Sequence, residues 1–149
     1  EKDKLNIDLA KMKKLGIKEG PHLRKLKEGK AIKYKGKDVT PEEVTYLVQG
    51  KKLTYVADTG VCENCTKLAQ GADLLISESV YATAMQDKAE EYKHLTAKDA
   101  AMIASHSDVK KLVLTHFSQR YKTVEEIEEN ARMIFPNTTC AYDFMKIKV

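Results

Sequence analysis

Runs typical of β-strands alternate with segments typical of helices from residue 53 onward, and this alternation restricts the possible folds more than any other feature. Three β-prone runs of mostly aliphatic residues lie at 53–57, 73–77 and 111–115. The helix-like segments between them lie at 61–70, where Gly71 follows as a typical terminator, and from Thr96 onward. Strands that alternate with helices predict an α/β fold, a sheet layered with helices.

The end of the chain continues the same alternation. Thr123 and Glu126 have the spacing of a capping box, which predicts a helix starting there. Val124, Ile127, Ala131 and Ile134 would share its apolar face. Residues 138–149 are predicted to form one or two closing strands.

Length and composition place the chain among globular domains. It has 149 residues, of which 42% are hydrophobic and 32% are charged, so it can bury a core without disulfides. No apolar run approaches the roughly 20 residues of a membrane helix. Three cysteines are too few for a secreted disulfide framework, and no signal peptide is visible, so we expect a cytoplasmic protein. Because the chain starts at Glu1 without a methionine, we expect it to be part of something longer.

Charge is distributed unevenly along the chain. Residues 1–37 contain 13 Lys/Arg and 5 Asp/Glu, a net charge of +8, whereas residues 38–149 contain 13 and 17, a net charge of −4. We therefore expect two parts, a basic arm at 1–37 and a mildly acidic body at 38–149. Such an arm indicates contact with a polyanion. A lysine-rich surface that is merely solvated is the alternative.

The arm is predicted to start with a short helix at 9–15, which Asn6 or Asp8 can cap and Gly16 can end. Gly20-Pro21 is a turn signal.

Residues able to do chemistry stand where the strands end. Asp58, Glu78 and His116 each lie at or just after the end of a β-prone run, and sites of α/β proteins assemble at that edge of the sheet. His94 lies two residues before Thr96, the start of a helix whose N-terminus favours an anion. Aspartate and histidine are ligands for zinc. The alternatives are an Asx turn at Asp58, an ordinary hydrogen-bonded histidine at 116 and a boundary charge at Glu78.

Four short segments follow one another in the order Tyr55–Thr59, Ile76–Tyr81, His94–Ala97 and Thr115–Tyr121. In that order they resemble motifs of ribonuclease Z, the tRNA 3′-processing endonuclease of the metallo-β-lactamase superfamily. Tyr55–Thr59 resembles its Gly-Asp-Thr segment with Ala57 in place of glycine, and Ile76–Tyr81 resembles its His-Glu-Ala-Thr segment but keeps only the glutamate. His94–Ala97 resembles the His-Ser-Thr loop with Leu95 for serine. Thr115–Tyr121 resembles the final metal motif.

The resemblance extends to both ends of the chain. Residues 135–137 and 141–143 match the closing strands of the family. Leu15–Pro21 and the segment 25–29 resemble its protruding arm, which in the family grips the elbow of the tRNA. The resemblance implies RNA-binding roles for residues along this arm: Lys11, Lys13, Lys14, Lys18, Gly20, Pro21, Arg24, Lys25 and Lys27. Phosphate contacts of that kind do not depend on sequence.

One motif of the family is absent. The main metal motif, His-x-His-x-Asp-His, does not occur in these residues. The resemblance therefore implies the C-terminal half of a metallo-β-lactamase (αββα) fold, whose N-terminal half is a missing partner. It also implies a homodimer, by analogy with short family members. The fragment alone is expected to be inactive, with little or no zinc bound, because catalytic zinc needs at least three protein ligands.

The resemblance implies the reaction and the residue roles. The complete enzyme would hold two Zn²⁺ ions, with Asp58 bridging both and His116 completing one. It would cleave precursor tRNA and leave a 3′-hydroxyl on the tRNA. His94 would protonate the departing oxygen or stabilise charge on the phosphorane, because imidazole exchanges protons near neutral pH. Glu78 would orient His94 or a metal ligand.

Three other interpretations stay open. The chain can belong to another metallo-β-lactamase-fold phosphodiesterase with small substrates, although such an enzyme needs no remote basic arm. It can be a non-catalytic RNA-binding module in which Asp58 and His116 are vestigial. A doubly wound regulatory domain would need no metal and no approach of these two residues.

The Cys62–Cys65 spacing is compatible with a redox or zinc site. A structural zinc site would need two further ligands, and Cys140 supplies at most one. Core packing is the favoured interpretation, because both cysteines are predicted to share the apolar face of a helix with Leu68 and Ala69.

Overall fold

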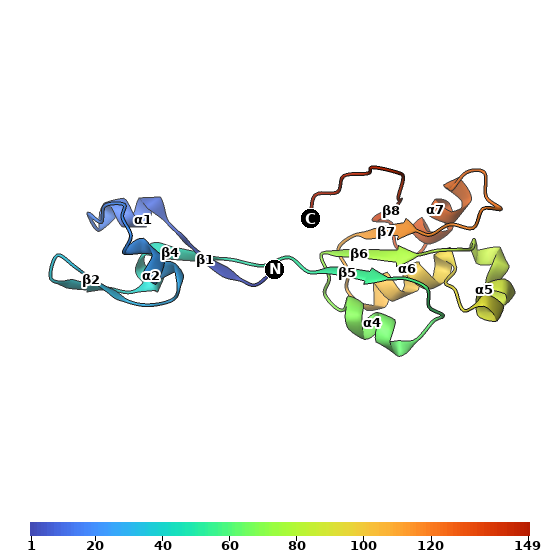
Figure 1. Ribbon diagram of the computed structural model, residues 1–149, viewed down its shortest axis with the longest axis horizontal. Helices are drawn as coiled ribbons and strands as arrows, with labels where there is room; N and C mark the ends of the chain where they lie inside the picture. The colour runs from blue at the N-terminus through green and yellow to red at the C-terminus, as the bar shows by residue number, and fades with distance from the viewer. The chain divides into compact units, whose positions relative to one another are not determined.

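The computed structural model describes residues 1–149, which form two compact units, Glu1–Gly50 and Lys51–Val149 (Figure 1). The first unit extends past residue 37, where the charge pattern placed the boundary. Strand pairing explains the difference, because Lys4–Ile7 (β1) pairs antiparallel with Thr45–Val48 (β4). The added segment 38–50 contains no Lys or Arg. Charge therefore marks the basic segment but not the whole folded unit.

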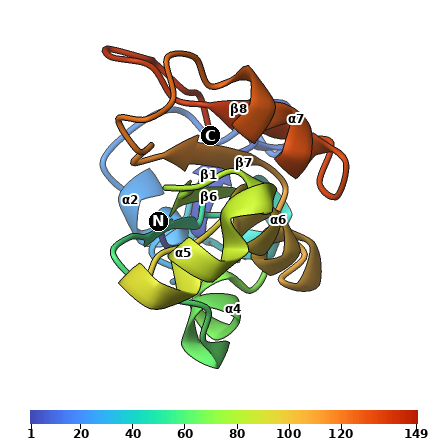
Figure 2. The same ribbon diagram turned by 90° about the vertical axis from the view of Figure 1, so that its right-hand side faces the viewer.

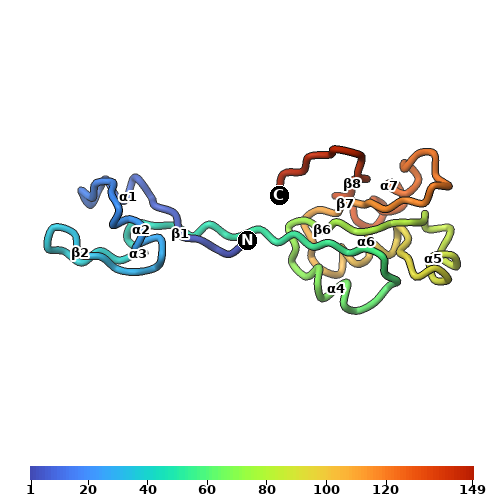
Figure 3. Tube along the Cα trace, viewed as in Figure 1, coloured from blue at the N-terminus to red at the C-terminus, as the bar shows by residue number.

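The first unit is built from short elements around a small apolar core (Figure 3). Besides β1 and β4 it contains a hairpin and three helices: β2 (Ile32–Tyr34), β3 (Lys37–Val39), α1 (Leu9–Lys14), α2 (Leu23–Lys27) and α3 (Pro41–Val44). Its buried residues are Met12, Ile17, Leu26, Ile32, Val39 and Val44.

Local signals account for much of this unit. Of the two capping candidates, Asp8 caps α1, and its carboxylate accepts hydrogen bonds from the N–H groups of residues 10 and 11. Asn6 instead lies within β1. In the β2–β3 hairpin, Lys35 and Gly36 both have positive φ, as a two-residue hairpin turn requires. Residue types at the turns therefore determine how this unit folds.

The second unit is a four-stranded parallel sheet with helices on one face (Figures 1 and 2). The strands lie in the order β5 (Leu53–Val56), β6 (Leu74–Glu78), β7 (Leu112–Thr115) and β8 (Thr138–Cys140). The connections contain α4 (Glu63–Ala69), the 3₁₀ turn η1 (Thr83–Met85), α5 (Gln86–Tyr92), α6 (Ala97–His106) and α7 (Glu125–Arg132). Helix α6 packs on β6 and β7 and lies between α4 and α7. The predicted α/β class is confirmed.

The two faces of this sheet differ. Leu75, Leu112 and Leu114 point toward the helices and are completely buried in the main core. On the opposite face Leu53 and Tyr55 are each more than half exposed. Helices thus cover one face and leave an apolar patch on the other. None of the helices combines the length and apolar character needed to cross a bilayer.

The capping box predicted at Thr123 is wrong, and the predicted closing segment forms one strand. Helix α7 begins at Glu125, and Thr123 forms no capping box with Glu126. Capping boxes instead start α3 at Thr40 and α6 at Thr96. Of the predicted closing segment, only Thr138–Cys140 forms a strand.

The expected apolar face of α4 is only partly present. Cys65 and Ala69 are buried, but Leu68 is 55% exposed and Cys62 is exposed at the position before the helix. The helix starts later than the pattern indicated, so Cys62 lies outside its periodicity. Core packing therefore applies to Cys65 and not to Cys62.

A charged cluster joins the starts of three strands at the edge of the sheet where the strands begin. The carboxylate of Asp73 accepts hydrogen bonds from Lys110 Nζ at 2.7 Å, the Lys52 backbone N–H at 2.9 Å and Lys51 Nζ at 3.1 Å. These bonds, above all that from Lys110, hold the pKa of Asp73 well below its usual value of 3.8. Ionised Asp73 therefore stabilises the folded state.

We predict that Asp73→Asn lowers the free energy of unfolding at pH 7 and that the loss shrinks on acidification. A lowered pKa stabilises the protein above the pKa of the unfolded state, and this contribution disappears as the pH falls through the folded-state pKa. Urea unfolding between pH 7 and pH 2 measures the difference, with the exposed Asp143→Asn as control. A difference that stays constant over this range would contradict the assignment.

Candidate metal centre

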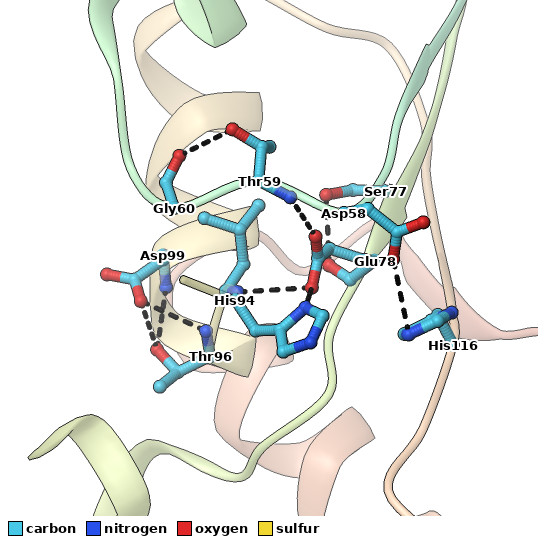
Figure 4. A network of polar contacts seen from close by, with 10 residues as sticks. Asp58, Thr59, Gly60, Ser77, Glu78, His94, Thr96, Asp99 and His116 are labelled. Carbon is cyan, nitrogen blue, oxygen red and sulfur yellow. Dashed lines mark hydrogen bonds and ion pairs between the residues drawn. The ribbon is translucent and has the colours of Figure 1, made fainter. Parts of the chain in front are cut away.

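The candidate residues meet at the edge where the parallel strands end (Figure 4). Glu78 is the last residue of β6 and is in register with Thr115 of β7, so His116 follows directly beside it. Asp58 comes two residues after the end of β5. The parallel sheet thus brings residues from distant parts of the sequence to one edge.

Asp58, His94 and His116 form a group that can hold a metal ion. His116 Nε2 lies 3.5 Å from Asp58 Oδ1, and the rings of His94 and His116 have centroids 5.5 Å apart. One ligand atom from each of the three residues lies within 4.8 Å of the others. Carboxylate oxygen and imidazole nitrogen are ligand types that zinc takes. The residues therefore fit a divalent cation, and the predicted approach of positions 58 and 116 is present.

Two of these residues have a strained backbone. Asp58 has φ of 50° and His116 has φ of 58°, in the left-handed region that side chains other than glycine seldom adopt. Such a residue costs about 1–3 kcal/mol, and strain of this kind gathers at functional sites. Aspartate tolerates the region better than histidine does. The strain supports a functional interpretation over an ordinary turn at either position.

Glu78 connects the loops that carry the other residues. Its side chain is completely buried. Oε1 accepts a hydrogen bond from the Thr59 N–H at 2.7 Å, and Oε2 accepts one from the Leu95 N–H at 3.2 Å. His94 Nδ1 lies 2.9 Å from the same Oε2. A buried carboxylate with this many partners is not an ordinary boundary charge. Because a carboxylate only accepts, it places the proton on Nδ1 and leaves Nε2 of His94 available.

The loop that carries His94 is held at both ends. Lys93 ends α5 in a left-handed conformation with φ of 60°. After His94, Thr96 forms a parallel bridge with Tyr81 and a capping box with Asp99. The Thr96 N–H donates to Asp99 and the Asp99 N–H to the Thr96 hydroxyl. The Asp99 carboxylate of the chain itself therefore lies at the start of α6, and the anion site expected there stays a prediction.

A pocket adjoins the centre. It has a volume of about 270 Å³ and is lined by Gly60, Val61, Gln86, Glu90, Lys93 and His94. His94 therefore belongs both to the metal-capable group and to the lining of a cavity that can admit part of a substrate.

The arm residues lie in the first unit. Lys11, Lys13 and Lys14 are on α1, Lys18 follows it, Gly20 and Pro21 precede α2, and Arg24, Lys25 and Lys27 are on α2. All the cationic members are exposed. Arg24 is engaged with Glu28 at 2.9 Å, and the bonds from Arg24 and Lys30 lower the pKa of Glu28. The other cations form an accessible positive surface.

Sequence reasoning missed two supporting features. The Thr96–Asp99 capping box has a readable spacing, Thr-x-x-Asp, and could have been identified. The contact of the Thr59 backbone with Glu78 could not, because a backbone N–H carries no sequence signal.

Comparisons with known proteins identify close relatives. No family model matches the chain. Ribonuclease Z of Methanothermobacter thermautotrophicus is 45% identical over 136 residues, covering 91% of this chain and 44% of that protein. Ribonuclease Z of Sulfolobus acidocaldarius is 40% identical over 138 residues, covering 93% and 47%.

Solved structures agree with these relatives. The short form of human tRNase Z aligns with a TM-score of 0.53 and 36% identity, covering 70% of this chain and 36% of that one. The metallo-β-lactamase fold protein YhfI of Bacillus subtilis aligns with a TM-score of 0.56 at 22% identity, covering 65% and 40%, which shows a shared fold. The chain spans about half the length of the curated relatives it matches. Over nearly all of its own length the chain belongs to the ribonuclease Z family, within the metallo-β-lactamase fold.

Proposed function

We propose that this chain supplies the C-terminal half of a zinc-dependent endoribonuclease that removes the 3′ trailer from precursor tRNA and leaves a 3′-hydroxyl on the tRNA. The convergence of Asp58, His94 and His116 at one sheet edge carries the proposal. It occurs in a chain whose relatives are named ribonuclease Z.

Asp58 and His116 would be the ligands that this chain contributes to the two proposed zinc ions. The other ligands come from the His-x-His-x-Asp-His motif of an N-terminal half. Bound zinc supplies a water molecule that loses its proton near neutral pH. The 149 residues alone are expected to be inactive, because they do not contain that motif.

His94 is the proposed proton donor to the departing oxygen, and Glu78 is its positioning residue. Glu78 fixes the ring through Nδ1 at 2.9 Å, which leaves Nε2 for the substrate. His94 also lines the pocket of about 270 Å³, which offers space for part of a substrate. Burial of Glu78 strengthens the arrangement, because the interaction is shielded from water.

The basic arm, residues 1–37, is proposed to bind tRNA through its phosphates. Its exposed cations contact the backbone of any tRNA regardless of sequence, which suits an enzyme with many substrates. A phosphodiesterase of small molecules would gain nothing from them.

Two further partners are proposed, an N-terminal half of the fold and a second copy of the complete protein. The sheet face with Leu53 and Tyr55 exposed is proposed to pack against the N-terminal half of the αββα fold. A cytoplasmic homodimer is proposed for the complete protein, by analogy with short family members.

The first test concerns the metal ligands in the protein completed with its N-terminal half. Because each residue would contribute a ligand atom, Asp58→Asn and His116→Ala are both expected to lower the zinc content. Zinc content by atomic absorption measures this. Asp108→Asn, an exposed aspartate with φ of 52°, and His106→Ala are the matched controls. Full zinc content in both site variants would refute the ligand assignment.

The second test separates proton transfer from metal binding. His94→Ala is expected to lower kcat for precursor-tRNA cleavage by about 10²–10⁴-fold at unchanged zinc content. Glu78→Gln is expected to lower kcat less than His94→Ala does, because the amide oxygen can still accept the hydrogen bond from His94 Nδ1. Zinc loss in His94→Ala would make His94 a ligand instead, and unchanged kcat would remove it from the reaction.

The third test concerns the arm. Replacing Lys13, Lys14 and Lys18 by glutamine is expected to weaken tRNA binding and to reduce the slope of log Kd against log salt by about 2, since each phosphate contact contributes about 0.7–0.9. Glutamine at Lys88, Lys98 and Lys148 removes the same charge from exposed positions of the second unit and is the control. Equal effects of the two triple variants would contradict a specific role for the arm.

A further inference from the structure

Two of the three cysteines lie next to each other at the start of α4. Cys62 Sγ and Cys65 Sγ are 3.5 Å apart, within hydrogen-bonding distance for sulfur. Cys62 is exposed in the extended residue before the helix, whereas Cys65 is buried in its first turn. The Cys62 thiol is thus accessible to a reagent in solution, and the buried Cys65 thiol lies next to it.

The surroundings of the three thiols shift their pKa values in different directions. Hydrogen bonds with Cys65 lower the pKa of the Cys62 thiol. Burial raises the pKa of Cys65, and burial with Glu128 nearby raises the pKa of Cys140 to about 12. Cys62 is therefore the nucleophile of the set, and Cys140 is inert.

The pair also borders open space. An apolar pocket of about 240 Å³ is lined by both thiols together with Tyr55, Val56 and Leu68. A small disulfide molecule can therefore reach Cys62 without unfolding the helix.

We propose that Cys62 and Cys65 form a reversible intrachain disulfide, with a low-molecular-weight disulfide such as glutathione disulfide as the oxidant. The sulfur atoms must approach from 3.5 Å to a bond length of about 2.05 Å. The Cys62 carbonyl accepts a hydrogen bond from the Cys65 backbone N–H at 3.1 Å, which keeps the two residues next to each other.

The exchange proceeds in two balanced steps. The Cys62 thiolate attacks one sulfur of the oxidant, forms a mixed disulfide and releases one glutathione thiolate. The Cys65 thiol then loses its proton to water and attacks the Cys62 sulfur, which releases the second glutathione. The protein pair loses two electrons, and the oxidant is reduced to two thiols.

The cysteine pair is connected to the candidate metal centre through Thr59. The Thr59 side chain interacts with both cysteines, and its backbone N–H donates to Glu78 at 2.7 Å. The pair is therefore separated from Glu78 by a single residue, Thr59, and Glu78 in turn contacts His94.

The test incubates the 149-residue chain in buffers of increasing glutathione disulfide, followed by alkylation and intact-mass measurement. The expected product is a monomer lighter by two hydrogen atoms before alkylation, with two thiols lost together and Cys140 still free. Cys140→Ala is expected to behave in the same way. Reduction with excess glutathione is expected to restore both thiols.

Single variants identify the order of attack. Cys65→Ser is expected to retain one glutathionyl group on Cys62, because the resolving thiol is gone. Cys62→Ser is expected to remain unmodified, because Cys65 is buried. A wild-type chain that accumulates a glutathionyl group, links only to a second copy, or keeps all three thiols would overturn the proposal. Circular dichroism of each variant distinguishes a redox effect from loss of folding.

Discussion

The buried carboxylate of Glu78 is the interaction on which the rest of the candidate centre depends. A charge removed from water is tolerated only when it is paired and hydrogen-bonded. Glu78 meets that demand with two backbone N–H groups and one imidazole, which come from the loops after β5 and before α6. The hydrogen bonds to Glu78 therefore hold these two loops together, although nothing in the local sequence of either loop connects them. Thr59 follows Asp58 directly, so the same bond that satisfies Glu78 also places the proposed ligand.

The parallel sheet explains why these loops meet at all. Its strands end at one edge, and left-handed residues at Asp58 and His116 turn the chain there. At the opposite edge, where the strands begin, Asp73 accepts hydrogen bonds from three donors. The two ends of the sheet therefore differ in function. Where the strands begin, the hydrogen bonds to Asp73 hold the strands together. Where the strands end, the exposed residues Asp58 and His116 have a strained backbone. This separation is typical of α/β proteins, in which sites assemble beyond the strand ends.

The sequence predicts the parts of this molecule that local physics controls. Alternating strands and helices, the Asp8 cap and the position of His116 after a strand are all readable, because each depends on neighbouring residues. Tertiary contacts decide the rest. Burial of Glu78 depends on donors 16 to 19 residues away, and pairing of β1 with β4 extends the first unit past the basic segment. Thr123 has the spacing of a capping residue but does not cap α7. Cys62 lies outside α4, although the apolar periodicity predicted that it would lie within this helix.

Nitrogen NMR of the histidines during zinc titration of the completed protein tests the central claim most directly. The chain has four histidines, of which His22 and His106 are internal references. We predict that zinc shifts a ring nitrogen of His116, while the proton on Nδ1 of His94 stays in its bond with Glu78. Zinc-induced shifts at His22 or His106 with none at His116 would contradict a metal centre at the end of this sheet.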